Sequence, residues 1–267
     1  MNLVITGSSS GIGKFLTDSL EARGHVVCGL ARSVQARFGF QCDVSDWPSM
    51  HNCAEKITAQ WEAVGGLICC AGIQEPIGPA MEIDPAAWRS ALAVNLDGTF
   101  FSIRAFFPLL RRAQRRAKVI CFSGGGSTSP RANFAAYGVS KTGVVRLVET
   151  LAAEWEQQPL DINAVAPGAI FTRMTEQVLA RGAAAAGQIE FERASKQSRD
   201  NASQLGQVLG LIEFLLSPQS DGISGKLISA QWDPWKKLPA LKADLNSDIY
   251  TLRRIVPKDR GKDWGDK

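Results

Sequence analysis

The stretch MNLVITGSSSGIGKFL (residues 1–16) joins a short apolar run to a helical pattern through a turn that contains three glycines. The apolar run, residues 3–6, indicates a strand, and residues 11–24 have the spacing of a helix that ends at Gly24. Glycine lets a backbone turn sharply and approach a ligand closely, and the free N–H groups of a helix N-terminus attract anions. The stretch therefore predicts a strand, a phosphate-binding turn and a helix.

Strand-like and helix-like segments alternate along the rest of the chain. Strands that alternate with helices of this length favour a parallel sheet with both faces covered. We therefore predict an α/β fold, a Rossmann-like doubly wound parallel sheet of about seven strands with helices on both faces. The expected strands are residues 3–6, 25–31, 38–44, 66–72, 117–126, 160–168 and 225–230, and the expected helices are 11–24, 46–65, 85–116, 135–158 and 202–217.

Two segments depart from this alternation. Residues 173–201 end in a polar run, SKQSRDNAS, and we expect a mobile helical lid over a substrate. Residues 1–235 then form a single dinucleotide-binding and catalytic domain, and residues 236–267 form a C-terminal tail. From residue 233 onward the chain has nine lysines and arginines against six aspartates. Apolar side chains between Trp232 and Trp264 favour a tail docked on the domain or on a neighbouring subunit.

The composition excludes several classes of function. A net charge of +4 over 267 residues is too small to indicate a nucleic-acid partner, and no apolar run is long enough to cross a membrane. Two histidines leave little room for a histidine metal cluster or a Ser-His-Asp triad, and we expect no metal. Six cysteines without CxxC spacing and the absence of a signal peptide predict reduced thiols and a cytoplasmic location.

A tyrosine and a lysine stand four residues apart in AAYGVSKTG (residues 135–143). Residues with this spacing share one face of a helix, so Tyr137 and Lys141 are expected to lie side by side. A nearby ammonium group stabilises a phenolate and lowers the pKa of a tyrosine, which is ordinarily about 10. Such a pair can exchange a proton with a carbonyl or an alcohol near neutral pH.

The TGxxxGIG turn at residues 6–13 and the YxxxK pair at residues 137–141 together resemble the short-chain dehydrogenase/reductase family, classical type. The resemblance covers about residues 1–230 and implies hydride transfer between the nicotinamide C4 and a substrate carbonyl or secondary alcohol. It implies that Tyr137 exchanges the proton and that Lys141 lowers the tyrosine pKa and binds the nicotinamide ribose. Asn95, in AVNLDGTF, corresponds to the family's asparagine that supports a proton relay.

The family also places a serine thirteen residues before the tyrosine, to hold the reacting oxygen. In this sequence that position is Gly124, in CFSGGGSTSP. Ser123 is favoured for the role because it ends a strand, and Ser127 in the following loop is the alternative. This is the clearest departure from the family pattern in the core of the site.

Three further segments match the family's cofactor-binding positions. They are CDV at residues 42–44, CCAG at 69–72 and PGAIFT at 167–172, where Thr172 corresponds to a donor to the nicotinamide carboxamide. In CCAG both family asparagines are replaced by cysteines, so the strand-bridging asparagine bonds are expected to be lost. Besides Tyr137 and Lys141, the expected cofactor-binding residues are Gly7, Ser9, Ser10, Gly11, Ile12, Gly13, Arg32, Ser33, Asp43, Val44, Ala71, Gly72, Pro167, Gly168, Ile170 and Thr172.

The end of the second strand bears on the choice of nicotinamide cofactor. An acidic residue there binds the ribose 2′-hydroxyl of NAD, but this chain has Ala31 at that position. Arg32 and Ser33 follow and suit a 2′-phosphate, whereas Ser10 stands where some NADP-binding relatives have a basic residue. NADP(H) is therefore favoured, with NAD(H) as the alternative.

The partner implied is a small-molecule carbonyl or alcohol, and a similarity of the tail to family members of bacterial surface-sugar synthesis favours a sugar-like one. A keto-acyl chain and a small cyclic ketone are the alternatives, and the direction of the reaction stays open. The helix at residues 135–158 packs between subunits in the family, which implies a homodimer or homotetramer. Two other functions remain open from the residues alone. One is a non-catalytic dinucleotide-binding regulator, and the other is a protein that binds partners through its aromatic, basic tail.

Overall fold

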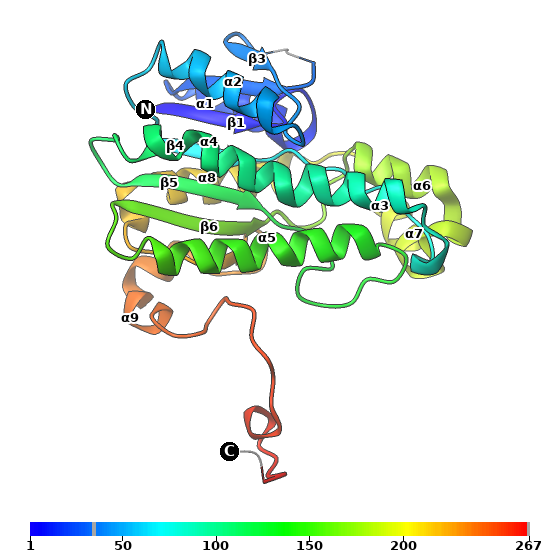
Figure 1. The fold of residues 1–267 in the computed structure, drawn as a ribbon. Helices are drawn as coiled ribbons and strands as arrows, with labels where there is room; N and C mark the ends of the chain where they lie inside the picture. Colours follow the sequence, from blue (N-terminus) through cyan, green and yellow to red (C-terminus); the bar gives the residue numbers. More distant parts are fainter. Residues whose placement is uncertain (34–35, 266–267) are drawn as a thin grey trace.

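A computed structural model describes residues 1–33 and 36–265, so residues 266 and 267 of the predicted tail lie outside the described part. Seven strands form one parallel sheet in the order β3-β2-β1-β4-β5-β6-β7 (Figure 1). The prediction of a doubly wound parallel α/β sheet of about seven strands is confirmed. Because the strand order reverses between β1 and β4, a crevice opens at the carboxyl ends of these strands, which is where such sheets bind ligands.

The elements follow the predicted order. The strands are β1 (Asn2–Thr6), β2 (Val26–Ala31), β3 (Gly39–Gln41), β4 (Gly66–Cys69), β5 (Ala117–Phe122), β6 (Leu160–Ala166) and β7 (Leu227–Ser229). The helices are α1 (Gly11–Ala22), α2 (Trp47–Thr58), α3 (Pro85–Leu92), α4 (Gly98–Leu110), α5 (Ala135–Glu154), α6 (Arg173–Ala186), α7 (Gln188–Ser195), α8 (Ala202–Leu216) and α9 (Lys242–Leu245).

Local signals in the sequence account for several helix ends. Asp46 caps α2 by accepting a hydrogen bond from the Ser49 N–H at 2.9 Å, as its position before a proline predicts. The predicted helix 46–65 is shorter than expected and ends at Thr58. The expected helix 85–116 is divided into α3 and α4 by a π-helical segment, Ala93–Asp97. Segments of this type often mark functional sites.

Two apolar cores hold the helices on opposite faces of the sheet (Figure 1). Side chains of α2, α4 and α5 fill one core, and side chains of α1 and α8 fill the other. Cys69 packs in the first core and Cys70 against the second, so the two adjacent thiols lie on opposite faces of the sheet, as successive side chains along an extended chain do. All six cysteines are free. The two cores fix the central strands, and with them the positions of the loops at the carboxyl ends.

The run RRAQRRAK at residues 111–118 contains five basic residues, and two of them pair with one buried acid. Lys118 lies in β5 and is 3% exposed, and its Nζ is 2.7 Å from Asp161 Oδ2 in the neighbouring strand. Arg116 pairs with the same carboxylate at 3.1 Å. These two cations therefore serve an internal ion-pair network, because the register of β5 and β6 places them beside a buried acid.

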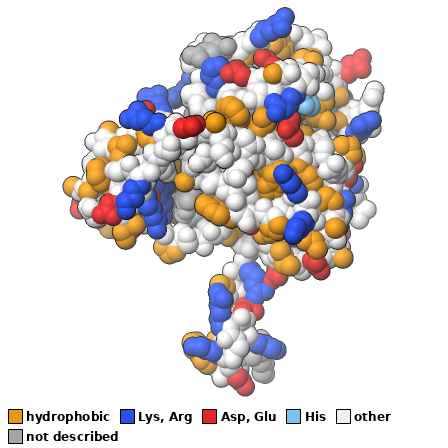
Figure 2. Space-filling view, turned by 180° about the vertical axis from the view of Figure 1, so that it is seen from behind, with side chains coloured by type: hydrophobic (Ala, Val, Ile, Leu, Met, Phe, Trp, Pro, Cys, Tyr) orange, Lys and Arg blue, Asp and Glu red, His pale blue; other side chains and the backbone are white. Residues whose placement is uncertain are grey.

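The tail is docked over its first part. Leu238 and Leu245 are buried in the core under α8, and Lys226 Nζ donates to the carbonyls of Ser247 and Ile249 at 2.8 and 3.1 Å. Beyond residue 252 the chain leaves the domain, and Figures 1 and 2 show this segment standing off the body of the protein. Trp232 and Trp264 are 71% and 75% exposed, so they do not contribute to docking on this chain.

None of the helices in residues 1–33 and 36–265 combines the length and the apolar character that a membrane crossing requires.

Candidate active site

The turn between β1 and α1 depends on glycine at two positions. Gly7 has a φ of +71°, and a Cβ on it would lie 2.7 Å from the Ala71 backbone nitrogen. A Cβ on Gly13 would overlap the carbonyl oxygen of Gly7. Ser10, the N-cap of α1, makes no side-chain hydrogen bond to the helix. The two glycines therefore let the turn pack closely against the residues after β4, and the N-terminus of α1 borders the cleft in the manner of an anion-binding site.

The Thr6 hydroxyl ties this turn to the end of β4. Its Oγ1 accepts hydrogen bonds from the N–H groups of Cys70 and Ala71 at 3.2 and 3.3 Å. The sequence predicted that strand-bridging bonds are lost where cysteines replace asparagines at residues 69 and 70. The structure shows a bridge of another kind, because a threonine at the end of β1 supplies the acceptor.

A cleft of about 1770 Å³ lies at the carboxyl ends of the strands and is lined in part by residues of α6 and α7. It extends from the glycine turn past Tyr137 to α6 and α7. Asn95 is the one predicted site residue that does not line it. The predicted residues that line it are Gly7, Ser9, Ser10, Gly11, Ile12, Gly13, Arg32, Ser33, Asp43, Val44, Ala71, Gly72, Ser123, Ser127, Tyr137, Lys141, Pro167, Gly168, Ile170 and Thr172.

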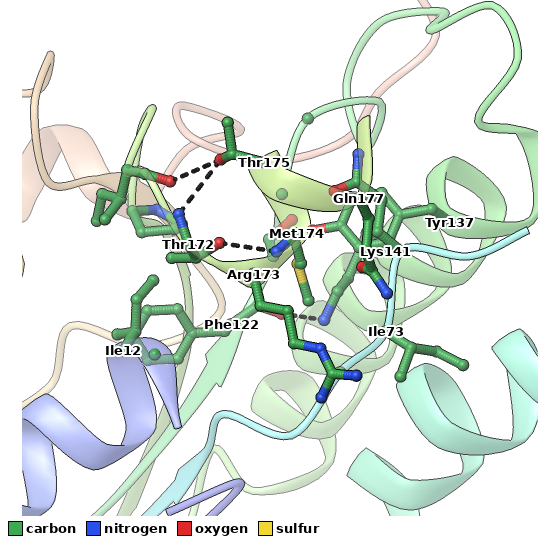
Figure 3. A pocket seen from close by; sticks show the side chains of 18 of the residues that line it. Ile12, Ile73, Phe122, Tyr137, Lys141, Thr172, Arg173, Met174, Thr175 and Gln177 are labelled. Atoms are coloured by element: carbon green, nitrogen blue, oxygen red, sulfur yellow. Dashed lines mark hydrogen bonds between the residues drawn. The ribbon is translucent and has the colours of Figure 1, made fainter. Parts of the chain in front are cut away.

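Tyr137 and Lys141 lie on one face of α5 and border the middle of the cleft (Figure 3). They are 7% and 4% exposed. Lys141 Nζ donates a hydrogen bond of 2.9 Å to the Phe122 carbonyl at the end of β5 and lies 5.8 Å from the centre of the Tyr137 ring. The helix spacing thus brings the phenol and the ammonium group to the same cavity.

The charges around this pair differ from the expectation. Burial raises the pKa of Tyr137, and the neighbouring charge that lowers it is Arg131 rather than Lys141. Burial also lowers the pKa of Lys141 itself, to about 8. The prediction that Lys141 lowers the tyrosine pKa is therefore not met in this structure, because the lysine is itself desolvated and bound to a backbone carbonyl.

Asn95 acts behind the cleft wall. It lies in the π-helical segment and is fully buried. Its Oδ1 accepts from the Ile73 N–H at 2.8 Å, and its Nδ2 donates to the Ile73 carbonyl at 2.9 Å and to Ser140 Oγ at 3.0 Å. A Cβ on Gly72 would lie 3.1 Å from Asn95 Oδ1 and 3.5 Å from Lys141 Nζ. Asn95 thus fixes the backbone that borders Lys141.

Gly124 leaves room for the tyrosine. A Cβ at this position would overlap the Tyr137 hydroxyl, so a side chain cannot be accommodated while Tyr137 keeps its position. The preceding residue, Ser123, is 3% exposed, and its backbone N–H is held by the Val165 carbonyl at 2.9 Å. Its Oγ is buried at the cleft and has no hydrogen-bond partner within the described residues. Ser127 also borders the cleft, one turn further along the loop.

The loop at residues 167–172 faces the glycine turn across the cleft. Thr172 begins α6, and its Oγ1 accepts from the Met174 N–H at 3.3 Å (Figure 3). A Cβ on Gly11 would lie 4.0 Å from the Thr172 methyl group. Gln231 Nε2 donates to the Pro167 carbonyl at 3.1 Å and holds the start of the loop. The two predicted cofactor segments are therefore close enough to enclose one ligand.

At the end of the cleft next to β2, Arg32 and Ser33 are exposed beside Asp43. The Asp43 carboxylate accepts from Ser45 Oγ at 2.6 Å and from the Ser45 N–H at 2.9 Å. The hydrogen bond from the Ser45 hydroxyl is the main cause that lowers the pKa of Asp43, and the Arg32 charge adds to it. No acidic side chain stands directly after β2, where Arg32 and Ser33 follow Ala31.

The part of the cleft beyond Tyr137, lined by α6 and α7, contains polar groups that sequence reasoning missed. Gln74, Arg131 and Glu190 line it together, although they come from three separate segments. The segment expected to form a lid, residues 173–201, contains both charged and apolar side chains. That mixture does not show which of them pairs with a residue elsewhere in the chain. Arg131, in the loop before α5, carried no signal of its own.

Known proteins that are similar to this chain include dehydrogenases and a reductase family. A family model described as enoyl-(acyl carrier protein) reductase matches residues 8–231. D-threitol dehydrogenase of Mycolicibacterium smegmatis is 28% identical over 185 residues, covering 64% of this chain and 70% of that protein. Galactitol 2-dehydrogenase (L-tagatose-forming) of Cereibacter sphaeroides is 29% identical over 240 residues, covering 84% and 91%. The aldohexose dehydrogenase of Thermoplasma acidophilum superposes with a TM-score of 0.75 at 22% identity, covering 85% and 91%.

The burial of Lys141 predicts a dependence of stability on pH. Below pH 8 the amine is protonated in the folded and unfolded states, and the folded state bears the full cost of burying the charge. Between pH 8 and the ordinary value of 10.5 the unfolded chain holds a proton that the folded chain has lost, so the free energy of unfolding rises with pH. Relative to Lys141→Met, the wild type should gain up to about 3 kcal/mol over this range.

The measurement is urea unfolding of both proteins at pH 7.5, 9 and 10. The difference between the two unfolding free energies isolates Lys141 from other groups that titrate. A difference that does not change with pH would contradict the burial of a charged amine at this position.

Proposed function

Because the chain belongs to the short-chain dehydrogenase/reductase family of oxidoreductases, we propose that it transfers hydride between a nicotinamide dinucleotide and a carbonyl or secondary alcohol. The observation that carries this proposal is the position of Tyr137 and Lys141 in the same cleft as the glycine turn. An acid–base group and an anion-binding turn are thereby brought to opposite parts of one cavity, as the reaction requires.

The described residues fit such a cofactor. Gly11, at the first position of α1, leaves space that suits a pyrophosphate against the helix N-terminus, because a Cβ on it would meet only the Thr172 methyl group, at 4.0 Å. Asp43 would border the adenine half of the cofactor, and Thr172 would border its nicotinamide half, beside Tyr137. When bound, the nicotinamide supplies the carbon that accepts or donates hydride.

The chain's own residues then handle the proton. In reduction, the Tyr137 hydroxyl gives its proton to the carbonyl oxygen as hydride reaches the carbonyl carbon, and in oxidation the Tyr137 phenolate accepts the proton of the substrate hydroxyl as hydride leaves the substrate carbon. Lys141 is charged below about pH 8 and places a positive charge beside the proton acceptor. Ser123 Oγ donates to the reacting oxygen, and Asn95 supports the relay by fixing the Ile73 backbone next to Lys141.

We propose NADP(H) as the preferred cofactor, with NAD(H) as the alternative. The support is the absence of a carboxylate directly after β2 and the position of Arg32 and Ser33 at the rim of the cleft. A guanidinium group binds a 2′-phosphate by charge-assisted hydrogen bonds, whereas a carboxylate there would repel it.

We propose a sugar-like alcohol or its carbonyl form as the substrate. The names of two relatives, a threitol dehydrogenase and a galactitol dehydrogenase, support this class. We also propose a homodimer or homotetramer, since Phe100 on α4 and Val139 on α5 leave apolar surface exposed on two neighbouring helices.

Tyr137→Phe should reduce kcat at least about 1000-fold, because the substrate loses its proton partner. Its affinity for NADPH should stay within about threefold of the wild type, since the ring that borders the cleft is retained. Turnover is followed by nicotinamide absorbance with a panel of sugar alcohols and ketones. Tyr250→Phe, in the tail, is the matched control and should retain activity. Equal turnover by Tyr137→Phe and wild type would contradict the mechanism and favour a role without Tyr137 chemistry.

The serine assignment is tested by comparing Ser123→Ala with Ser127→Ala. Ser123 has a buried hydroxyl without a partner, so its removal should cost about 10- to 100-fold in kcat without loss of stability. Ser127→Ala should stay within about threefold of the wild type. Steady-state kinetics and thermal unfolding are measured on both variants, and the reverse order of effects would assign the role to Ser127.

Arg32→Gln should weaken NADPH binding by about tenfold or more, because a charge-assisted bond to the phosphate is lost. NADH binding should change less than about twofold. Energy transfer from the seven tryptophans to the bound nicotinamide gives both dissociation constants. Arg37→Gln, an exposed arginine that does not line the cleft, is the matched control. Tighter binding of NADH than of NADPH by the wild type would overturn the cofactor preference.

A further inference from the structure

Three polar side chains from separate segments meet in the half of the cleft beyond Tyr137. Gln74 follows β4, Arg131 precedes α5, and Glu190 lies in the first turn of α7. Gln74 is 5% exposed, and the side chains of Arg131 and Glu190 are 20% and 16% exposed. We refer to these three residues as the polar cluster.

The guanidinium of Arg131 is held from several directions. Its Nε and Nη2 donate to Glu190 Oε2 at 2.8 and 2.7 Å. The Gln74 amide, with its oxygen facing Arg131, accepts from Nη1 and Nη2 at 3.1 Å. The group lies 3.7 Å from the centre of the Phe134 ring. A charged side chain fixed this well is preorganised to present its remaining hydrogen-bonding capacity to a ligand.

The polar cluster is close to the reacting atoms. A Cβ on Gly125 would lie 3.8 Å from Arg131 Nη1, and the neighbouring Gly124 touches the Tyr137 hydroxyl. Arg131 is also the charge that lowers the pKa of Tyr137. A substrate whose oxygen meets Tyr137 would therefore extend its other atoms toward the cluster.

The chemistry of the cluster selects among substrate classes. Glu190 offers acceptors and Arg131 offers donors, and a second cation, the 71% exposed Arg193, donates to Glu190 Oε1 at 2.8 Å from the solvent side. An acyl chain placed here would desolvate a charged pair without giving hydrogen bonds in return. A carboxylate or phosphate would compete with Glu190 for the guanidinium. A neutral molecule with several hydroxyl groups can both donate to Glu190 and accept from Arg131.

We propose that Gln74, Arg131 and Glu190 form the subsite that recognises the non-reacting hydroxyl groups of a polyol or of the corresponding keto sugar. This inference rests on the proposed function and adds residues that determine its specificity. The lid contributes the acceptor, so α7 takes part in the binding of the substrate as well as covering it.

The test compares a polyol with an alcohol that has no further hydroxyl group. Galactitol, D-threitol and cyclohexanol are oxidised with NADP⁺ by the wild type, Glu190→Gln and Arg131→Lys. Arg131→Lys keeps the positive charge near Tyr137 but loses the planar guanidinium. Arg181→Gln is the matched control, because Arg181 forms an ion pair of 3.0 Å between the lid and Glu75 outside the cleft.

The wild type should prefer at least one polyol over cyclohexanol by about 100-fold or more in kcat/KM, because a site built for hydroxyl groups discriminates against molecules that lack them. Glu190→Gln and Arg131→Lys should each lose about tenfold or more on that polyol. The ratio of kcat/KM for that polyol to kcat/KM for cyclohexanol should fall by about the same factor in both variants, whereas Arg181→Gln should keep the wild-type ratio.

Two results would overturn the inference while leaving hydride transfer by this chain intact. One is a parallel loss on polyol and cyclohexanol, or no loss on either, which would make the cluster structural. The other is a wild type that oxidises cyclohexanol or reduces an acetoacetyl thioester but accepts neither polyol. A wild type that turns over none of these compounds, although it binds NADPH, would overturn both this inference and the proposed function.

Discussion

The close approach of backbone to backbone at the glycine turn is the constraint on which the rest of the site depends. The N-terminal end of α1 reaches the end of β1 only because Gly13 leaves space at the Gly7 carbonyl, and Gly7 in turn lies against Ala71. The Thr6 hydroxyl fastens β4 to the same point. A side chain at either glycine would displace α1 from the sheet and shift the floor of the cleft with it.

A second constraint is the burial of polar groups beside Tyr137. Burial disfavours both the phenolate and the ammonium ion, and the structure compensates with a few fixed contacts rather than with solvent. The Phe122 carbonyl holds Lys141, and Asn95 holds the backbone next to it. The acid–base pair is thus held by groups on β5 and the π-helical segment, and residues of both elements pack in the apolar cores.

Two parts of the site were predictable from the sequence because each is encoded within one short segment. The glycine turn and the Tyr137–Lys141 pair are local patterns, and a helix period places each without knowledge of the rest of the chain. The direction of the tyrosine pKa was not predictable, because it depends on burial and on Arg131, six residues away along a loop. The pairing of Arg131 with Glu190 joins residues 59 positions apart and leaves no periodic trace in the sequence.

Gly124 shows how a departure from a family pattern can follow from packing. The Tyr137 hydroxyl lies where a side chain at residue 124 would begin, so a serine at the usual spacing would collide with the group that it is meant to assist. The hydroxyl available to the substrate is then one residue earlier, at the rigid end of β5. Ser123 Oγ is buried there without a partner in the described part of the chain. An unpaired buried hydroxyl costs free energy on folding, of order 1–3 kcal/mol. That cost is recovered when a ligand oxygen completes the hydrogen bond, which makes Ser123 the group whose pairing depends on the substrate.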